Sequence, residues 1–365
     1  SSAASDVYKR QRYRLLFQLC AEVADQPRHL STHLGGVIIS GKPLNTLSPI
    51  QMAAKGIRVL QFDKDDVEDL GLLKLDLLCL RMLGAVEDTV RPLQLDLDSV
   101  PLDNGGTYAL LSTGETAGAF QLESPAQRAL QQRLKADNAE DIVASVALIR
   151  PGPIKGNMVE PFLARRKGRA PITYIHPALE KILKKTYGVV LFQEQVIEIA
   201  VEIAGFDPGE ADELRRTMTH HRSKKEMEEI GRNFIRKALA RGVPRQVAET
   251  VFSYIEGYAG YGFCEAHAAA FGDTAYKTAY LLQHHPTHFY AGILNNQPTG
   301  FYPPHTIVTE ARRRGIRILP LDINVSEKDF VASDTAVRVG FKDVKNLGEK
   351  DIESLLAVRA QGPVS

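Results

Sequence analysis

Apolar positions recur every three or four residues through most of the chain from Met82 to about residue 258. This spacing places apolar side chains on one face of a helix, so it predicts a largely helical region. Ser124-Pro125 and Asp207-Pro208 agree with this, because each puts a capping side chain before a proline that suits a first helical turn. The helices expected here cover residues 126–134, 137–149, 177–184, 194–204, 209–218, 224–241 and 245–258.

The N-terminal part shows shorter, β-type patterns. A helical repeat over residues 12–30 ends at Pro27, and Gly35-Gly36 then precedes the β-branched run at residues 37–39, which predicts a turn into a buried strand. We expect two more strands at residues 59–62 and 70–80. Further expectations are a disordered or non-native stretch at residues 1–11, a short strand at 317–322, and two short helices within 339–359.

Composition sets wide limits on the class of protein. The 365 residues are 44% hydrophobic, which suggests about two domains, and no apolar run is long enough to cross a bilayer. Cys20, Cys79 and Cys264 lie far apart, which argues against a zinc ribbon or a disulfide scaffold and fits a reducing cytoplasm. The net charge of +1 does not by itself indicate nucleic acid. Basic clusters recur at residues 165–169, 181–185, 220–225 and 312–314, although each alone is typical of a solvated helix face.

Lys74 and Asp76 interrupt an apolar stretch two residues apart. In a strand they would project from the same face. A buried carboxylate without a partner is costly, so a divalent metal or a phosphate would explain the pair. The alternative is a charged pair on the exposed face of an edge strand.

Cations also gather near turns of the helical region. Arg150 precedes the rigid turn at residues 151–153, and Arg215 and Arg216 lie near a helix end where two guanidinium groups could bind phosphate. The alternative for these arginines is simple matching to the helix dipole. Tyr261 lies within the glycine-rich segment at residues 259–267 and His267 ends it; this segment could approach a base and a phosphate, or could be an ordinary linker.

Two other patterns each have two interpretations. His284 and His288 have the spacing of zinc ligands on a helix, but Pro286 interrupts them and no acidic residue lies close in sequence. Residues 344–352 read as a helix, a glycine turn and a new helix, whose start could bind a phosphate or could belong to an ordinary hairpin.

The order of these patterns resembles the C-family of bacterial DNA polymerases, which includes the alpha subunit of DNA polymerase III and its error-prone relative. The resemblance runs from about residue 12 to the end of the chain. It rests on the segments at residues 33–40, 61–64, 74–78, 120–124, 150–153, 187–195, 214–216, 259–263 and 319–324.

The resemblance implies an α+β fold that is predominantly helical. It would consist of the end of a thumb and the C-terminal part of a nucleotidyltransferase palm at residues 12–82, fingers at 83–325, and the start of a helix-hairpin-helix module at 326–365. The implied reaction is the addition of deoxynucleoside triphosphates to a primer 3′ end, with two Mg²⁺ ions. Implied partners are primer–template DNA, a sliding clamp, and replisome or mutasome subunits that bind elsewhere on the parent protein.

The resemblance also assigns roles to single residues. Asp76 matches a metal-binding palm aspartate, and Lys74 matches the lysine beside it. Arg150, Arg215, Arg216, Tyr261 and His267 fall in the nucleotide site, and Lys345, Gly348 and Lys350 fall in the hairpin that binds DNA backbone.

Two departures from the family pattern matter. The chain lacks the paired palm aspartates, so we expect a fragment that is inactive alone. Glu265 stands where replicative members carry lysine, and together with residues 295–302 it favours the error-prone branch. The competing hypothesis is a non-catalytic nucleic-acid-binding protein derived from the same fold.

Overall fold

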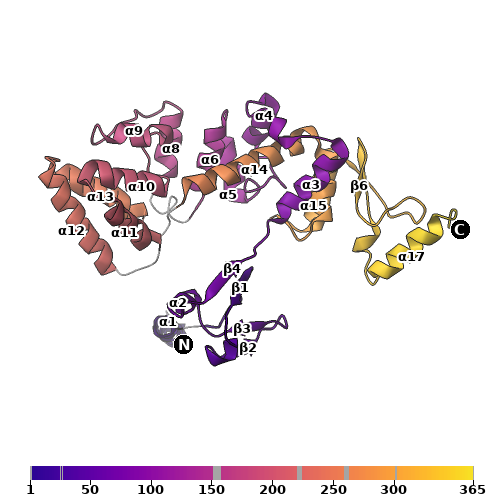
Figure 1. The fold of residues 1–365 in the computed structure, drawn as a ribbon, viewed down its shortest axis with the longest axis horizontal. Coiled ribbons are helices and arrows are strands. Elements are labelled where there is room, and N and C mark those ends of the chain that lie inside the picture. Colours follow the sequence, from indigo (N-terminus) through magenta and orange to yellow (C-terminus); the bar gives the residue numbers. More distant parts are fainter. Residues whose placement is uncertain are drawn as a thin grey trace. The chain divides into compact units, whose positions relative to one another are not determined.

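The computed structural model describes residues 2–24, 26, 28–150, 158–219, 224–258, 263–300 and 302–364. The chain divides into two compact units, residues 1–80 and residues 81–365, and each is considered by itself (Figure 1). Helices dominate and the sheets are small, which confirms the expected α+β class with a helical majority.

The first unit holds one long helix and two small antiparallel sheets. Helix α1 begins at Ser2, about ten residues before the expected start. The strand patterns correctly predicted β1, β3 and β4 but missed β2 and α2. Asp63 explains α2, because its carboxylate accepts hydrogen bonds from the amides of Asp65 and Asp66 in the first helical turn. The elements are α1 (Ser2–Val23), β1 (Gly36–Ile39), η1 (Leu44–Thr46), β2 (Ile50–Met52), β3 (Arg58–Leu60), α2 (Lys64–Asp69) and β4 (Leu73–Asp76), with β1 paired to β4 and β2 paired to β3.

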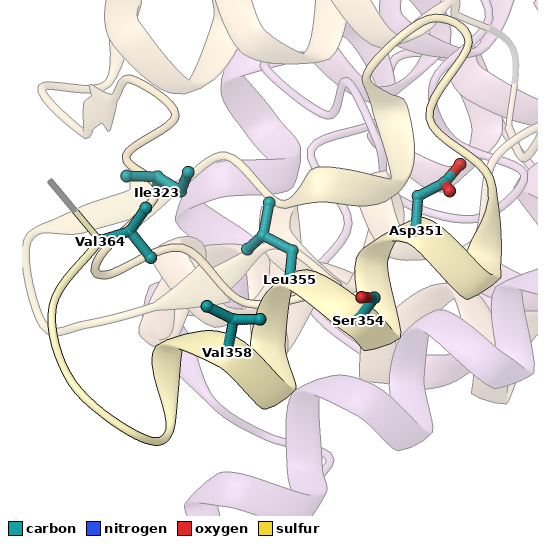
Figure 2. Close-up of a pocket in the computed structure, with 6 residues that line it drawn as sticks. All are labelled: Ile323, Asp351, Ser354, Leu355, Val358 and Val364. Atoms are coloured by element: carbon teal, nitrogen blue, oxygen red, sulfur yellow. The ribbon is translucent and has the colours of Figure 1, made fainter.

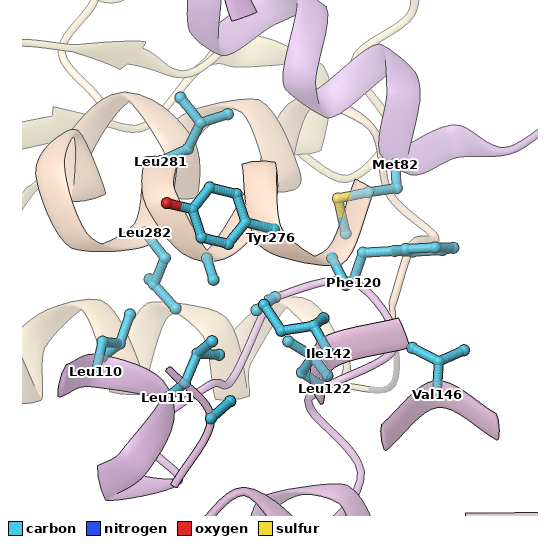
Figure 3. Packing of buried hydrophobic residues seen from close by; sticks show 14 of the residues in the cluster. Met82, Leu110, Leu111, Phe120, Leu122, Ile142, Val146, Tyr276, Leu281 and Leu282 are labelled. Atoms are coloured by element: carbon cyan, nitrogen blue, oxygen red, sulfur yellow. The ribbon is translucent and has the colours of Figure 1, made fainter. Parts of the chain in front are cut away.

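The second unit begins with helices that pack around one central helix, α14 (Glu265–His284). The buried Tyr276 of α14 illustrates the packing, because its ring lies among apolar side chains while its hydroxyl donates to the carbonyl of Pro101 (Figure 3). Such paired burial avoids the cost of an unsatisfied phenol. The helices of this core are α3 (Arg81–Leu93), α4 (Gly105–Thr113), α5 (Pro125–Leu134), α6 (Ala139–Leu148), α8 (Val159–Arg166), α14, α15 (Pro286–Asn295) and α16 (Pro304–Arg313).

Residues 179–255 of this unit form a second apolar core. Phe234 is its most buried aromatic residue, and its ring packs against those of Phe206 and Phe252. The sequence predicted most of these helices to within about two residues, because their apolar positions are regular. They are α9 (Leu179–Leu183), α10 (Gln193–Ile199) with its π-helical continuation (Ala200–Ala204), α11 (Pro208–Thr219), α12 (Lys224–Ala240) and α13 (Arg245–Tyr258).

The C-terminal part of the unit carries a three-stranded sheet and a final helix. Strand β5 (Arg317–Leu319) runs parallel to β7 (Ala336–Arg338), and β6 (Val331–Ala332) runs antiparallel to β7. The expected pair of short helices is observed as one 3₁₀ turn (Phe341–Asp343) and one α-helix, α17 (Glu349–Arg359).

Candidate nucleotide and DNA sites

Asp76 lies at the end of β4, opposite Gly36 of β1. Its Oδ1 accepts a hydrogen bond from the amide of Leu78, and its Oδ2 lies 3.6 Å from Nε2 of His33. The glycines of the neighbouring turn make this approach possible, because a Cβ at Gly36 would lie 2.8 Å from Nδ1 of His33. The sequence did not single out His33 as a site residue, although it lies in the same motif as the turn.

The expected burial of Asp76 and Lys74 is wrong for this unit. All four residues of β4 are exposed, and the Asp76 side chain keeps 51% of its surface accessible. β4 belongs to a two-stranded sheet, and the short helix α2 that contacts it leaves all four of its residues exposed.

The side chains around Asp76 do not make up a complete set of ligands for the expected metal. Within the described ranges, no group of three or more histidine, cysteine, aspartate or glutamate side chains gathers in one place. Mg²⁺ takes six oxygen ligands, which include water and substrate phosphates, and here Asp76 supplies one carboxylate beside one imidazole. The described residues therefore do not form a magnesium site by themselves.

Arg150 and His267, which are far apart in sequence, come together at the start of α14. The guanidinium carbon of Arg150 lies 4.1 Å from the centre of the Phe263 ring, a cation–π contact. The His267 ring meets the Phe263 ring edge-on at 5.2 Å and lies 4.0 Å from the ring of Phe271. Burial between these rings, and then the charge of Arg150, lower the pKa of His267 below its ordinary value. The imidazole is thus neutral near pH 7.

The start of α14 is held in place by neighbouring elements. The carbonyl of Phe263 accepts from the amide of Gln193, and the amide of Glu265 donates at 2.9 Å to the carboxylate of Glu194. Lys185 lies 2.6 Å from Glu265, so the residue from which we expected the error-prone branch carries an ion pair. Tyr261, the remaining residue expected here, lies outside the described residues.

Arg215 and Arg216 share one counterion on α11. Nε and Nη2 of Arg215 donate to Oδ1 of Asp212 at 2.9 and 2.7 Å, and Nη2 of Arg216 lies 2.7 Å from Oδ2. These hydrogen bonds hold the pKa of Asp212 below its usual range. The carboxylate therefore brings the two guanidinium groups together, which the divergence of adjacent helical positions alone would not do. Sequence reasoning missed Asp212 because a carboxylate three or four residues before an arginine is common on exposed helices.

The C-terminal hairpin presents its cations at the start of α17. Lys345, Gly348 and Lys350 are all exposed there. The amide of Gly348 donates at 3.0 Å to the carboxylate of Asp351, so an acidic side chain already occupies one of the amide positions that a phosphate would use. Beside this helix, an open hollow is lined by Ile323, Asp351, Ser354, Leu355, Val358 and Val364 (Figure 2).

The zinc hypothesis at His284 and His288 gains no support from geometry. Nε2 of His284 lies 2.9 Å from the side-chain oxygen of Asn104, and Nδ1 of His288 lies 3.4 Å from the hydroxyl of Thr287. No third ligand joins them within the described ranges.

We also find no described helix that is long and apolar enough to cross a membrane.

Comparison with known proteins gives matches along most of the chain. Family models describe residues 2–79 as a bacterial DNA polymerase III alpha NTPase domain, residues 76–242 as a bacterial DNA polymerase III alpha subunit finger domain, and residues 315–365 as a helix-hairpin-helix motif. A protein named error-prone DNA polymerase from Symbiobacterium thermophilum is 56% identical over 96% of this chain and 35% of its own length. Proteins of the same name from Dechloromonas aromatica and Anaeromyxobacter dehalogenans are 42% and 40% identical over 91% and 100% of this chain, and over 33% and 34% of their own lengths. The chain spans about a third of the length of these relatives.

Proposed function

Because this chain belongs to the C-family of bacterial DNA polymerases, we propose that it is the palm, fingers and hairpin segment of a DNA-directed DNA polymerase. The intact enzyme would add deoxynucleoside triphosphates to a primer 3′ end. The observation that carries the proposal is the succession of three matched families in one order along one chain. The names of the relatives and Glu265 support the error-prone branch, with a role in translesion synthesis and DNA repair.

The described residues supply only part of the chemistry. We propose that Asp76 contributes one carboxylate to a Mg²⁺ site, and that the other carboxylates belong to parts of the parent enzyme that this chain does not include. The 365-residue chain should then be inactive alone. Any magnesium-dependent primer extension by the isolated chain would contradict this.

The basic side chains of the second unit are proposed to bind the incoming nucleotide. Arg215 and Arg216 are positioned to bind the phosphates of the incoming triphosphate, since two forked guanidinium groups match phosphate oxygens. Arg150, whose guanidinium carbon lies over the Phe263 ring, adds a cation. His267 is neutral near pH 7 and can donate a hydrogen bond without adding charge.

Triphosphate binding separates this proposal from the competing one. We expect the chain to bind a fluorescent deoxynucleoside triphosphate, and the double change Arg215→Ala and Arg216→Ala to weaken that binding at least about tenfold. The estimate follows because a hydrogen bond to a charged group contributes about 1.5–3 kcal/mol before solvent exposure reduces it. Arg232→Ala with Arg236→Ala on α12 removes the same charge and serves as the control.

The second candidate is a non-catalytic protein that binds DNA through the hairpin, and it is favoured by the incomplete metal ligand set. It predicts DNA binding that weakens with salt but no triphosphate binding in any variant. Triphosphate binding that is insensitive to both arginine changes would contradict our assignment of the α11 pair.

Partners and location complete the proposal. Primer–template DNA would contact Lys345, Gly348 and Lys350 at the hairpin. A sliding clamp and replisome or mutasome subunits would bind the parent enzyme elsewhere. Cys20, Cys79 and Cys264 are free thiols, and a cytoplasmic location of the parent enzyme would suit them.

A further inference from the structure

A group of cations gathers where helices α5 and α8 end. Arg133 lies in the last turn of α5, and Lys135 follows it as the C-cap residue. Lys167 caps the end of α8, and Gly168 and Arg169 come directly after it. We call Arg133, Lys135, Lys167 and Arg169 the α5–α8 patch. None of its members was assigned to the nucleotide site or to the hairpin.

Two ion pairs fix the helices that carry this patch. Nη2 of Arg133 lies 2.7 Å from the carboxylate of Glu160 on α8, and Arg166 of α8 forms a buried ion pair with Asp141 of α6. The local carboxylates are therefore engaged with Arg133 and Arg166. Among the described residues, Lys135, Lys167 and Arg169 make no ion pair and no side-chain hydrogen bond.

The remaining charge is positive and open to solvent. After burial, the charges with the largest effect on Lys167 are those of Arg169, Lys135, Arg166 and Arg133, all cations, and they act to lower its pKa. Lys135 and Arg169 are exposed. A Cβ added at Gly168 would meet nothing within 4 Å, so the turn between the cations is uncovered.

The backbone at Lys135 argues that its charge has a use. Its φ angle is +51°, a left-handed conformation in which glycine is the usual residue at a helix end. A lysine there strains the backbone, whereas glycine would end the helix without strain. Attraction to the carbonyl ends of α5 and α8 could also favour cations here, and the experiment below separates the two explanations.

We propose that the α5–α8 patch binds the phosphate backbone of DNA, as a contact separate from the C-terminal hairpin. The inference rests on the proposed function, because it assumes that the chain binds DNA. It adds a second contact within residues 76–242, the part matched to the finger domain. Each cation that neutralises a phosphate releases a counterion, so the contact must appear in the salt dependence of binding.

The test measures binding of fluorescein-labelled single-stranded and duplex oligonucleotides by anisotropy over a series of KCl concentrations. The patch variant combines Lys135→Gly, Lys167→Gln and Arg169→Gln. The matched control combines Arg232→Gln, Arg236→Gln and Arg245→Gln on α12 and α13, with the same loss of charge. We expect the slope of log K against log salt to become shallower by about 2–3 in the patch variant, at roughly 0.7–0.9 per lost contact, and to stay unchanged in the control.

The single variant Lys135→Gly controls for misfolding, because it removes the backbone strain together with the charge and should therefore stay folded. It should preserve the helical circular dichroism spectrum and make the slope shallower by about 0.7–0.9. If strain relief raises stability while the slope stays at the wild-type value, the cations serve only the helix ends and the inference is overturned. A surface for an acidic protein would give the same unchanged slope.

A third variant, Lys345→Gln with Lys350→Gln, keeps this inference distinct from the proposed function. If that variant weakens DNA binding while the patch variant does not, the patch assignment fails and the hairpin assignment stands. If the wild-type chain shows no salt-dependent DNA binding, both fail. A larger loss with single-stranded DNA than with duplex would place the template strand at the patch, and the reverse would place the duplex there.

Discussion

The buried ion pair between Arg166 and Asp141 permits a quantitative prediction about how the fingers region is held together. The two side chains are only 11% and 2% exposed. Nε of Arg166 donates at 2.6 Å to Oδ1 of Asp141, and its Nη2 contacts Oδ2, so the pair is bidentate. Nη2 also lies 3.0 Å from the carboxylate of Asp137. This geometry joins α8 to α6 directly before Lys167 of the α5–α8 patch in the chain.

The perturbation is Arg166→Met, which keeps much of the side-chain volume and removes the charge. Asp141 would then be buried without its cation, and breaking a buried pair in this way costs about 3–5 kcal/mol. The amide of Asp137 and the side chain of Asn138 still donate to Asp141, so we expect the lower end, about 3 kcal/mol. At about 2–4 °C per kcal/mol for a domain of this size, Tm should fall by about 6–12 °C.

The assay is a thermal melt of the 365-residue chain followed by far-ultraviolet circular dichroism. Arg133→Met is the matched control, because its pair with Glu160 is half exposed and should contribute less than about 1 kcal/mol. Arg166→Met combined with Asp141→Leu removes both charges and should be more stable than Arg166→Met alone. The reasoning fails if Arg166→Met has the same Tm as the wild type, or if the Tm of the double variant is not higher than that of Arg166→Met.

Three further predictions concern other parts of the second unit. Gly292→Ala places a methyl group 2.4 Å from the carbonyl oxygen of Ala85, so α15 and α3 must separate. The free energy of unfolding should fall by about 1–3 kcal/mol in a thermal melt, and an unchanged Tm would contradict this. Asp212→Asn removes the carboxylate that competes with phosphate for both arginines, so the chain should bind a fluorescent triphosphate several-fold more tightly. Weaker binding would instead show that Asp212 is needed to orient them. Burial lowers the pKa of His285 and His288, so the unfolded state binds more protons, and the free energy of unfolding should fall as pH drops below the ordinary histidine range. In a pH series of urea melts, the double variant His285→Gln with His288→Gln should show a smaller fall. An equal fall in both proteins would contradict this prediction.

Regular apolar spacing and capping residues made the helices of the second core predictable from sequence. In the first core, helix α5 likewise begins directly after Ser124, whose hydroxyl accepts from the amide of Gln127, as the Ser-Pro signature indicates. Helix α14 was missed because it follows the glycine-rich loop and is rich in alanine. Helices α4, α6 and α15 pack around it, so its sequence shows no single apolar stripe.

Single motifs predicted the burial of side chains less well than they predicted helices. The Lys74 and Asp76 pair was expected to be buried because apolar residues flank it, yet those residues are exposed in a two-stranded ribbon. Burial depends on what covers a strand, which its own sequence does not specify. Arg166 shows the converse, since it lies in a basic run typical of a solvated face but is buried against a residue 25 positions away.

The same dependence on partners explains how a nearly neutral chain can carry a cluster of cations such as the α5–α8 patch. The net charge is only +1, which gave no indication of a nucleic-acid ligand. Folding does not distribute the charges evenly, because Asp141 and Glu160 are engaged by Arg166 and Arg133. Lys167 is then left among cations at a helix end, where no carboxylate is among the charges that affect it most. The local field therefore follows from which carboxylates are already paired, and that pairing is a property of the fold rather than of composition.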